Sequence, residues 1–316
     1  MQIIVHGGAG GDPEEPEPRQ AVLDEAAETG TEESTPLDAV EAAIRVLESS
    51  PRFNAGVGGA VQTDGTVRTD AGIMTSDREI GAACSMPGVE HAVSVARVVL
   101  EETPHIFVSG EQAVALADAY GVETNVDLWS ERTRERWAEL ETPEDGPRAH
   151  LAWIRERFGR TDPDGRDEDE DSEEEGGEAK RQASPAGVED EHDHDTVGAV
   201  AFDGETLAAA TSTGGRWLAL AGRVGDVPQV GSGFYCSPAG GASATGAGED
   251  IARVTLSRRV VRHIENGHDA QTATDLAIES FGEITGSSAG IIAIDARGTL
   301  GSAYNSDAMQ TGEARR

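Results

Sequence analysis

The stretch "TVGAVAFDGETLAAATSTGG" (196–215) is the most regular segment of the sequence. Two runs rich in Val, Ala and Thr flank the dipeptide Asp203-Gly204, which is typical of the tight turn in a β-hairpin. We therefore expect two buried antiparallel strands here. The hairpin begins at a threonine, and the residues before it, "EHDHD" (191–195), are all acidic or histidine.

The residues that precede this hairpin form the most acidic part of the chain. Residues 161–195 contain 16 Asp and Glu against three Arg and Lys, and they have no apolar periodicity. Dense like charge with few apolar side chains is typical of a disordered segment. We expect residues 160–195 to be an acidic linker between residues 1–159 and residues 196–316.

The whole chain has an unusual charge balance. Its 316 residues include 59 Asp and Glu against 25 Lys and Arg, the formal net charge is -34, and Lys180 is the single lysine. A surface of this kind repels nucleic acid and anionic membranes, and high salt screens its self-repulsion. The charge predicts a halophilic protein from a salt-rich cytosol, without nucleic-acid or membrane partners.

Other features of the sequence also point to the cytoplasm. The two cysteines, Cys84 and Cys236, are too few for a disulfide framework, so we expect buried structural thiols in a reducing compartment. The start "MQIIVHGGAG" lacks the basic region of a signal peptide. No apolar stretch approaches the ~20 residues that cross a bilayer.

Several other segments have recognisable periodicity. Residues 34–51 predict a helix that Thr35 caps, with Pro36 at its first position and one apolar face. That face contains Leu37, Val40, Ile44 and Leu47. The remaining patterns predict a strand over 3–10 ending in a glycine turn, a helix over 90–105 that stops before Pro104, a strand over 105–110, helices over 110–121 and 249–267, and a hairpin over 289–305.

A threonine at the start of a strand becomes chemically distinctive if the chain is cut in front of it. Thr196 would then carry a hydroxyl and a free α-amine on one residue. An α-amine titrates near pH ~8, so at neutral pH part of it can accept a proton. The amine can therefore act as the general base for the hydroxyl of its own residue.

Six short motifs follow one another along the chain. They are "HGGAG" (6–10), "FNAGVG" (53–58), "DTVGAVAFD" (195–203), "AAATSTGG" (208–215), "GRVGDVP" (222–228) and "ATGAGED" (244–250). In this order the motifs resemble the plant-type asparaginase / isoaspartyl peptidase family, over nearly the whole chain outside the acidic linker. The resemblance implies an α+β fold, the four-layer αββα sandwich of the N-terminal nucleophile hydrolases.

The resemblance also implies an activity. Members of the family cleave themselves, here between Asp195 and Thr196, and keep the two resulting chains together. The mature enzyme hydrolyses L-asparagine to L-aspartate and ammonia and cleaves β-aspartyl dipeptides, without a cofactor for catalysis. The processed units usually pair, so a homodimer is expected.

Catalytic roles follow from the matching positions. Thr196 matches the nucleophile, and Thr213 and Gly215 match the pair that positions it. Thr245 and Gly246 match the oxyanion hole, where backbone N–H groups stabilise charge on the carbonyl oxygen. Outside this context the same residues would be a strand start and two ordinary glycine turns.

Binding roles follow in the same way. Arg223 and Asp226 match the clamp on the α-carboxylate and α-amine of the substrate, and an Arg fork and a carboxylate suit these groups. Gly248 matches a further substrate contact, and Asn54 matches an asparagine close to the active site, for which a loop-stabilising role is the alternative. The family also holds a structural sodium ion through backbone carbonyls. The matching residues are Leu47, Glu48, Ser50, Phe53, Ala55 and Val57.

Some residues depart from the plant-type pattern. Residue 195 is Asp, where plant-type members usually have Gly, and His-Asp before the threonine is typical of glycosylasparaginases. The segment "RWLALA" (216–221) is more apolar than usual, and Ala247 replaces a usual threonine. A glycosylasparaginase-like or taspase-like hydrolase with a larger leaving group is therefore the alternative within the same mechanism.

An alternative of another class is a non-catalytic cation buffer. His192 and His194, with the acidic residues around them, could bind a divalent ion. Because metal sites need fixed ligands and this segment is expected to be disordered, a solvated charge run is the better interpretation.

Overall fold

The hairpin predicted from residues 196–215 is present and lies in the middle of a sheet. Strand β5 (Val197–Phe202) pairs antiparallel with β6 (Leu207–Thr213), and every residue of both strands is buried. At the turn, Asp203 Oδ1 accepts a hydrogen bond from the Thr206 backbone N–H at 2.7 Å, and Gly204 has φ +105°. The dipeptide therefore makes the turn that its sequence predicts.

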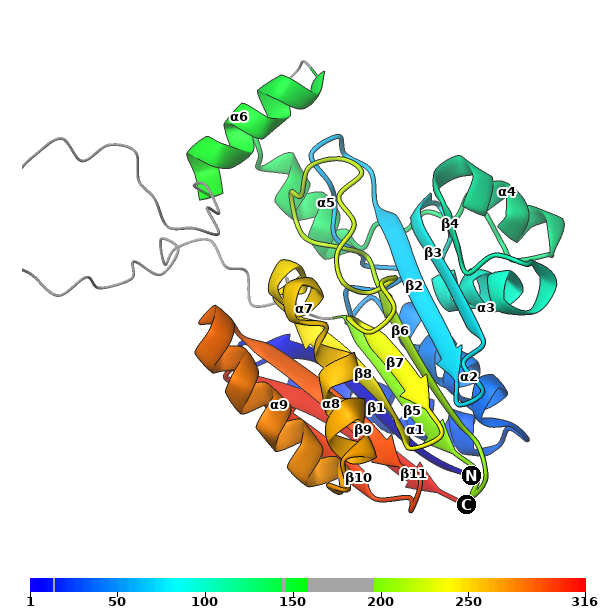
Figure 1. The fold of residues 1–316 in the computed structure, drawn as a ribbon. Helices are drawn as coiled ribbons and strands as arrows, with labels where there is room; N and C mark the ends of the chain where they lie inside the picture. Colours follow the sequence, from blue (N-terminus) through cyan, green and yellow to red (C-terminus); the bar gives the residue numbers. More distant parts are fainter. Residues whose placement is uncertain (14, 144–145, 159–195) are drawn as a thin grey trace, which may run out of the picture. The chain divides into compact units, whose positions relative to one another are not determined.

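The computed structural model of the chain describes residues 1–13, 15–143, 146–158 and 196–316 (Figure 1). The predicted linker over 160–195, with Asp195, lies outside the described residues. The chain divides into two units, Met1–Leu140 with Glu191–Arg316, and Glu141–Asp190. In the second unit, the structure describes helix α6 (Gly146–Phe158) and residues 141–143 before it. All elements described below belong to the first unit.

Seven strands form the larger sheet, in the order β11-β1-β5-β6-β2-β3-β4. Only β3 and β4 pair in parallel; every other neighbouring pair in this sheet is antiparallel. The two chain ends meet at one edge, because β1 pairs with β11 and the Met1 amino group donates to Arg316 O at 3.1 Å. The other strands of this sheet are β1 (Gln2–Gly10), β2 (Arg68–Thr75), β3 (Ile80–Pro87), β4 (Phe107–Ser109) and β11 (Ala308–Arg315).

A second sheet of four antiparallel strands packs against the first. Its order is β10-β9-β8-β7, and glycines let the two sheets approach closely. A Cβ atom on Gly72 would lie 1.9 Å from Cε1 of Phe234, and one on Gly198 would lie 1.9 Å from Oγ of Ser243. The strands are β7 (Phe234–Ser237), β8 (Gly240–Gly246), β9 (Ala289–Asp295) and β10 (Leu300–Tyr304).

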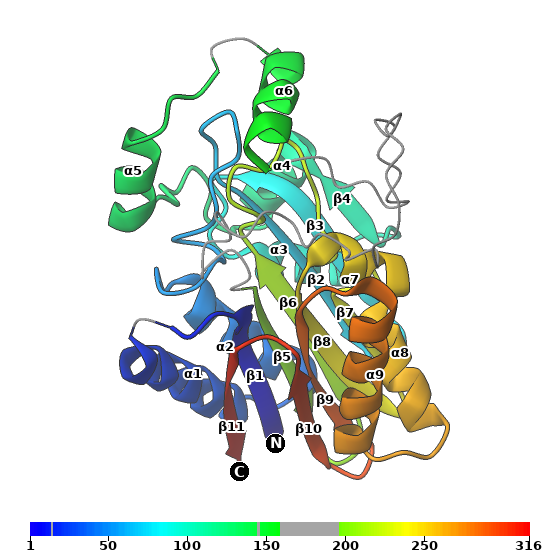
Figure 2. The same ribbon diagram turned by 90° about the vertical axis from the view of Figure 1, so that its left-hand side faces the viewer.

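Helices cover the two sheets, which gives a mixed α+β fold (Figure 2). Helices α1 (Pro16–Thr31), α2 (Pro36–Glu48) and α3 (Ala92–Glu102) contact the larger sheet, and α8 (Leu256–Glu265) and α9 (Ala270–Thr285) contact the smaller one. One apolar cluster lies between the first three helices and the larger sheet. Another includes the facing sides of both sheets and the inner sides of α8 and α9.

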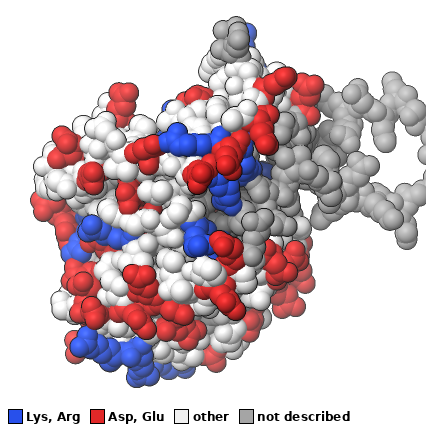
Figure 3. Space-filling model, turned by 180° about the vertical axis from the view of Figure 1, so that it is seen from behind, with Lys and Arg blue, Asp and Glu red and all other residues white. Residues whose placement is uncertain are grey.

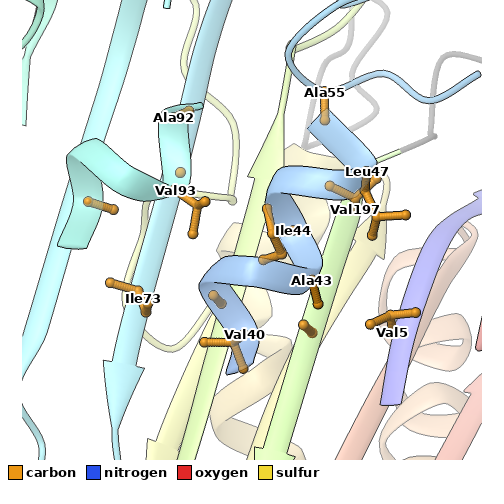
Figure 4. Packing of buried hydrophobic residues seen from close by; sticks show 14 of the residues in the cluster. Val5, Val40, Ala43, Ile44, Leu47, Ala55, Ile73, Ala92, Val93 and Val197 are labelled. Carbon is orange, nitrogen blue, oxygen red and sulfur yellow. The ribbon is translucent and has the colours of Figure 1, made fainter. Parts of the chain in front are cut away.

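The helix predicted over 34–51 is confirmed as α2. Thr35 Oγ1 accepts a hydrogen bond from the Asp38 backbone N–H at 3.2 Å, and Pro36 begins the helix. Val40, Ile44 and Leu47 are fully buried and Leu37 is partly buried, and Figure 4 shows the first three within the same cluster as Val93 and Val197. Three other predicted elements agree with α3, β4 and α4 (Gly110–Ala119), and the hairpin over 289–305 agrees with β9 and β10.

Two sequence predictions were wrong. The strand over 3–10 does not end in a glycine turn: β1 continues to Gly10, and the pairing with β11 shifts between His6 and Ala9. The helix over 249–267 is broken into α7 (Gly248–Val254) and α8, because Thr255 has φ +52°. A distant loop stabilises this break, since the backbone N–H of Arg258 donates to Gly231 O at 2.8 Å.

Two further expectations concern cysteines and membrane segments. Cys84 and Cys236 are both buried and free, as predicted, and burial raises the pKa of Cys84 to about 12. Within the described ranges of the chain, no helix is both long and apolar enough to cross a membrane.

We predict that Gly72→Ala lowers the free energy of unfolding by about 1–3 kcal/mol, because the added methyl group overpacks the space of the Phe234 ring. Urea denaturation of the variant and the parent measures the loss. Gly72→Ala combined with Phe234→Leu should lose less than the sum of the two single changes. Additive losses would show that the two sheets do not meet at this contact.

Candidate active site

Thr196 immediately precedes β5 and is buried beside the end of β6. Its side-chain hydroxyl donates to Thr213 Oγ1 at 3.1 Å. Thr213 Oγ1 also accepts from the Gly215 backbone N–H at 3.1 Å and donates to Asn54 O at 3.4 Å. The three residues predicted to form the nucleophile and its positioning pair are thus brought together by the hairpin and the turn after it.

Asn54 holds that turn against the loop before β2. Its Nδ2 donates to Gly215 O at 2.6 Å, and its Oδ1 accepts from the Ala60 backbone N–H at 2.8 Å. Its backbone carbonyl accepts from Gly214 N–H at 2.8 Å. A Cβ on Gly214 would lie 2.3 Å from the Cα of Gly59, so the two loops touch through glycines. Asn54 therefore supports the turn through both its side chain and its backbone.

Thr245 and Gly246 end β8, on the sheet opposite Thr196. Across the two sheets, Val200 lies opposite Gly241 and Gly198 lies opposite Ser243. Moving two residues further along each strand, from 198 to 196 and from 243 to 245, places Thr196 and Thr245 at the same end of the sheets. Thr245 is fully buried. Gly246 has φ +131°, a conformation that L side chains rarely adopt, and α7 begins two residues later. The predicted oxyanion-hole residues lie at the same end of the sheets as the nucleophile.

Arg223 and Asp226 lie close together at the start of α7. A Cβ on Gly248 would lie 2.7 Å from Asp226 Oδ1 and 3.0 Å from Arg223 Nη2. Gly248 therefore leaves open the space between a cation and a carboxyl group. Burial raises the pKa of Asp226 to about 7, against the opposing charge of Arg223. Arg223 Nε and Nη2 each donate to a carboxylate oxygen of Glu249 at 2.8 Å.

Asp70 is a buried acid near this group that the sequence did not reveal. It lies on β2 directly opposite Thr213 and accepts a hydrogen bond from the Ser85 backbone N–H at 2.6 Å. Ser85 has φ +56°, at a register shift between β2 and β3. Burial raises the pKa of Asp70 to about 7, while the Ser85 bond and the charge of Arg223 lower it. A single acid within the apolar run "DAGIM" was the available signal.

His6 is a second residue whose position the sequence did not predict. It lies on β1 beside β5 and is fully buried, with Nε2 at 2.9 Å from Ser243 Oγ. Burial lowers the pKa of His6 to about 3, and its interaction with the Thr196 backbone opposes this shift. The imidazole is therefore neutral at physiological pH, and its Nε2 binds the Ser243 hydroxyl. The motif "HGGAG" marked this residue without indicating its role.

Of the six residues predicted to bind sodium, Leu47 and Glu48 end α2, and the other four lie on the loop that follows and folds back onto the helix end. The Val57 N–H donates to Glu48 O at 2.9 Å, and Gly56 between them has φ +54°. In the described part of the chain, the carbonyls of Phe53, Ala55 and Val57 receive no backbone hydrogen bond. Among the described residues, no group of three or more His, Cys, Asp or Glu side chains could hold a metal. The free carbonyls fit a cation bound by main-chain oxygens.

Comparison with known proteins identifies the family of this chain. The asparaginase family (Asparaginase_2) matches residues 1–316. A plant-type L-asparaginase of Pyrococcus abyssi is 38% identical over 98% of this chain and 94% of its own length. One from Thermococcus kodakarensis is 37% identical over 97% and 94%, and an isoaspartyl peptidase/L-asparaginase of Danio rerio is 32% identical over 96% and 89%. The resemblance predicted from the six motifs is confirmed, and this chain belongs to the asparaginase family.

Proposed function

We propose that this protein is a self-cleaving threonine amidohydrolase that converts L-asparagine to L-aspartate and ammonia and cleaves β-aspartyl dipeptides. The observation that carries the proposal is the hydrogen bond from Thr196 to Thr213, together with Arg223 and Asp226 next to Gly248. Relatives named plant-type L-asparaginase and isoaspartyl peptidase/L-asparaginase support both substrates.

The first step of the proposed mechanism is maturation. The Thr196 hydroxyl attacks the carbonyl carbon of Asp195, the peptide bond becomes an ester, and water hydrolyses the ester. The products are an α chain of residues 1–195, which includes the predicted linker, and a β chain that begins at Thr196. They stay together because β5 is hydrogen-bonded to β1 of the other product. The proposed fold is the four-layer αββα sandwich, supported by helices against both sheets.

The second step is hydrolysis of the substrate. The freed α-amine accepts the proton of the Thr196 hydroxyl, whose oxygen attacks the side-chain amide carbon. We assign the oxyanion to Thr245 and Gly246, the α-carboxylate to Arg223 and the α-ammonium to Asp226, with Gly248 leaving room between the last two. Ammonia or an amino acid leaves with a proton, and water then hydrolyses the acyl-threonine ester to release aspartate.

The alternative substrate class has a larger leaving group, as in glycosylasparaginase-like or taspase-like enzymes. Arg216 is exposed and Trp217 is buried, and the Arg136 guanidinium of α5 (Glu131–Ala138) lies 4.0 Å from the centre of the Trp217 ring. Relatives named plant-type L-asparaginase and isoaspartyl peptidase/L-asparaginase favour the small leaving groups of asparagine and dipeptides. Parallel assays of L-asparagine, a β-aspartyl dipeptide and glycosyl-asparagine separate the candidates.

We also propose a bound ion, an oligomeric state and a cellular environment for the enzyme. The carbonyls of Phe53, Ala55 and Val57 support a structural sodium ion, whereas those of Leu47, Glu48 and Ser50 already accept backbone hydrogen bonds. The processed units are proposed to pair as a homodimer. Acidic side chains are spread over the face seen in Figure 3, and the basic ones form separate groups among them. This distribution supports a cytoplasmic protein adapted to high salt.

We predict that Thr196→Ala remains one chain of about 33 kDa without asparaginase activity, because it has no hydroxyl to attack the preceding carbonyl. The parent should give fragments of 195 and 121 residues by intact-mass measurement. Thr272→Ala, at an exposed position of α9, is the matched control and should be cut like the parent. An uncut parent with full activity would contradict the mechanism.

We predict that L-aspartate binds more weakly as the pH falls below about 7, by up to tenfold per pH unit. Burial raises the pKa of Asp226, so protonation in this range removes the charge that faces the ammonium group. Inhibition constants of the mature enzyme from pH 5 to 8 measure the effect. Asp226→Asn should bind weakly with a flatter profile; a profile like that of the parent would assign the proton to another group, such as Asp70.

We predict that raising KCl from about 0.1 M to about 1 M raises the melting temperature, because the Debye length falls from about 10 Å to about 3 Å and screens the repulsion among carboxylates. Thermal unfolding followed by circular dichroism measures the shift. A melting temperature independent of salt would count against the halophilic interpretation.

A further inference from the structure

Glu249 binds the guanidinium that is proposed to hold the substrate carboxylate. It lies in the first turn of α7, and its two oxygens accept from Arg223 Nε and Nη2 at 2.8 Å each. The side chain of Glu249 is 49% exposed and that of Arg223 is 19% exposed. A guanidinium has five N–H donors. The bidentate pair therefore leaves three of them, on Nη1 and Nη2, for another ligand.

Asp226 is a second carboxylate that could bind the Arg223 guanidinium in place of Glu249. Its Oδ2 is buried and has no hydrogen-bond partner in the described part of the chain. A buried carboxylate oxygen without a partner is costly, and arginine is a strong ligand for a carboxylate. Arg223 is close enough for its charge to lower the pKa of Asp226, yet the two side chains form no ion pair.

The glycines beside Arg223 place no side chain between its guanidinium and Asp226. Glycines lie on both sides of the guanidinium: a Cβ on Gly225 would be 2.9 Å from Nη1, and one on Gly248 would be 3.0 Å from Nη2. The same position on Gly248 is 2.7 Å from Asp226 Oδ1, so a small rotation would bring the two charges together. Such a pair would occupy both halves of the proposed binding site.

We propose that Glu249 is a positioning residue that keeps Arg223 and Asp226 apart, so that each stays free for one charged group of the substrate. This inference rests on the proposed function of the site. Glu249 could have one of two simpler roles instead, and each predicts a different effect on binding. A surface ion pair would contribute nothing to binding. A competitor for the arginine would weaken the binding of carboxylates.

The test uses three inhibitors of the mature enzyme that carry different groups. L-Aspartate has both the α-ammonium and the α-carboxylate, succinate lacks the ammonium, and β-alanine lacks the α-carboxylate. In Glu249→Gln, the Arg223–Asp226 pair must be broken before either group can bind. We therefore expect all three inhibition constants to rise by about tenfold, with kcat for L-asparagine changed less than about threefold.

Two further variants make the test specific. Glu265→Gln removes the same charge from an ion pair with Arg258 on α8, 3.0 Å long, and should leave all three constants unchanged. Glu249→Gln combined with Asp226→Asn removes the competing carboxylate, so succinate binding should recover towards that of Asp226→Asn alone. Cleavage into the 195- and 121-residue fragments shows that each variant folds.

The outcomes are distinct. Tighter binding of succinate by Glu249→Gln would make Glu249 a competitor, and unchanged constants would make it a surface partner. A loss confined to the two inhibitors with an α-carboxylate would mean that Glu249 only orients Arg223. Each of these results overturns the proposal. Failure of the proposed function would appear in the parent, as an absence of L-aspartate binding.

Discussion

The proposed chemistry depends on the register between β5 and β6. Because Val197 pairs with Ser212, Thr196 falls opposite Thr213 and its hydroxyl reaches Thr213 Oγ1. Side chains alternate along a strand, so a slip of one residue would turn Thr196 towards the other face of the sheet. The Asp203-Gly204 turn fixes the register at one end of the hairpin, and Asn54 holds the other end.

The sequence predicted those elements whose signals are local. The β5–β6 hairpin has its turn dipeptide, and α2 has its capping Thr35 and an apolar face of which Leu37 alone is only partly buried. The Thr196–Thr213 contact could also be anticipated, because it follows from the hairpin. For the same reason the family motifs on this hairpin were informative, since they place catalytic residue types at fixed positions of one local structure.

Features that depend on distant contacts could not be predicted in this way. The break at Thr255 is stabilised by the loop at Gly231, which no periodicity within 249–267 reveals. The residues of the candidate site that depend on distant contacts could not be predicted for the same reason. In a chain with 59 acidic residues, nothing local distinguishes Asp70 or Glu249 from the many solvated carboxylates. Their importance arises only when folding brings them to Arg223.

The pairing of β1 with β11 places the first and last residues of the chain side by side. A few added residues would join these ends, and the chain could then be opened in front of Thr196. Such a circular permutant, once its initiator methionine is removed, would begin with Thr196. Its nucleophile would carry a free amine from synthesis, so catalysis could be studied without any self-processing event.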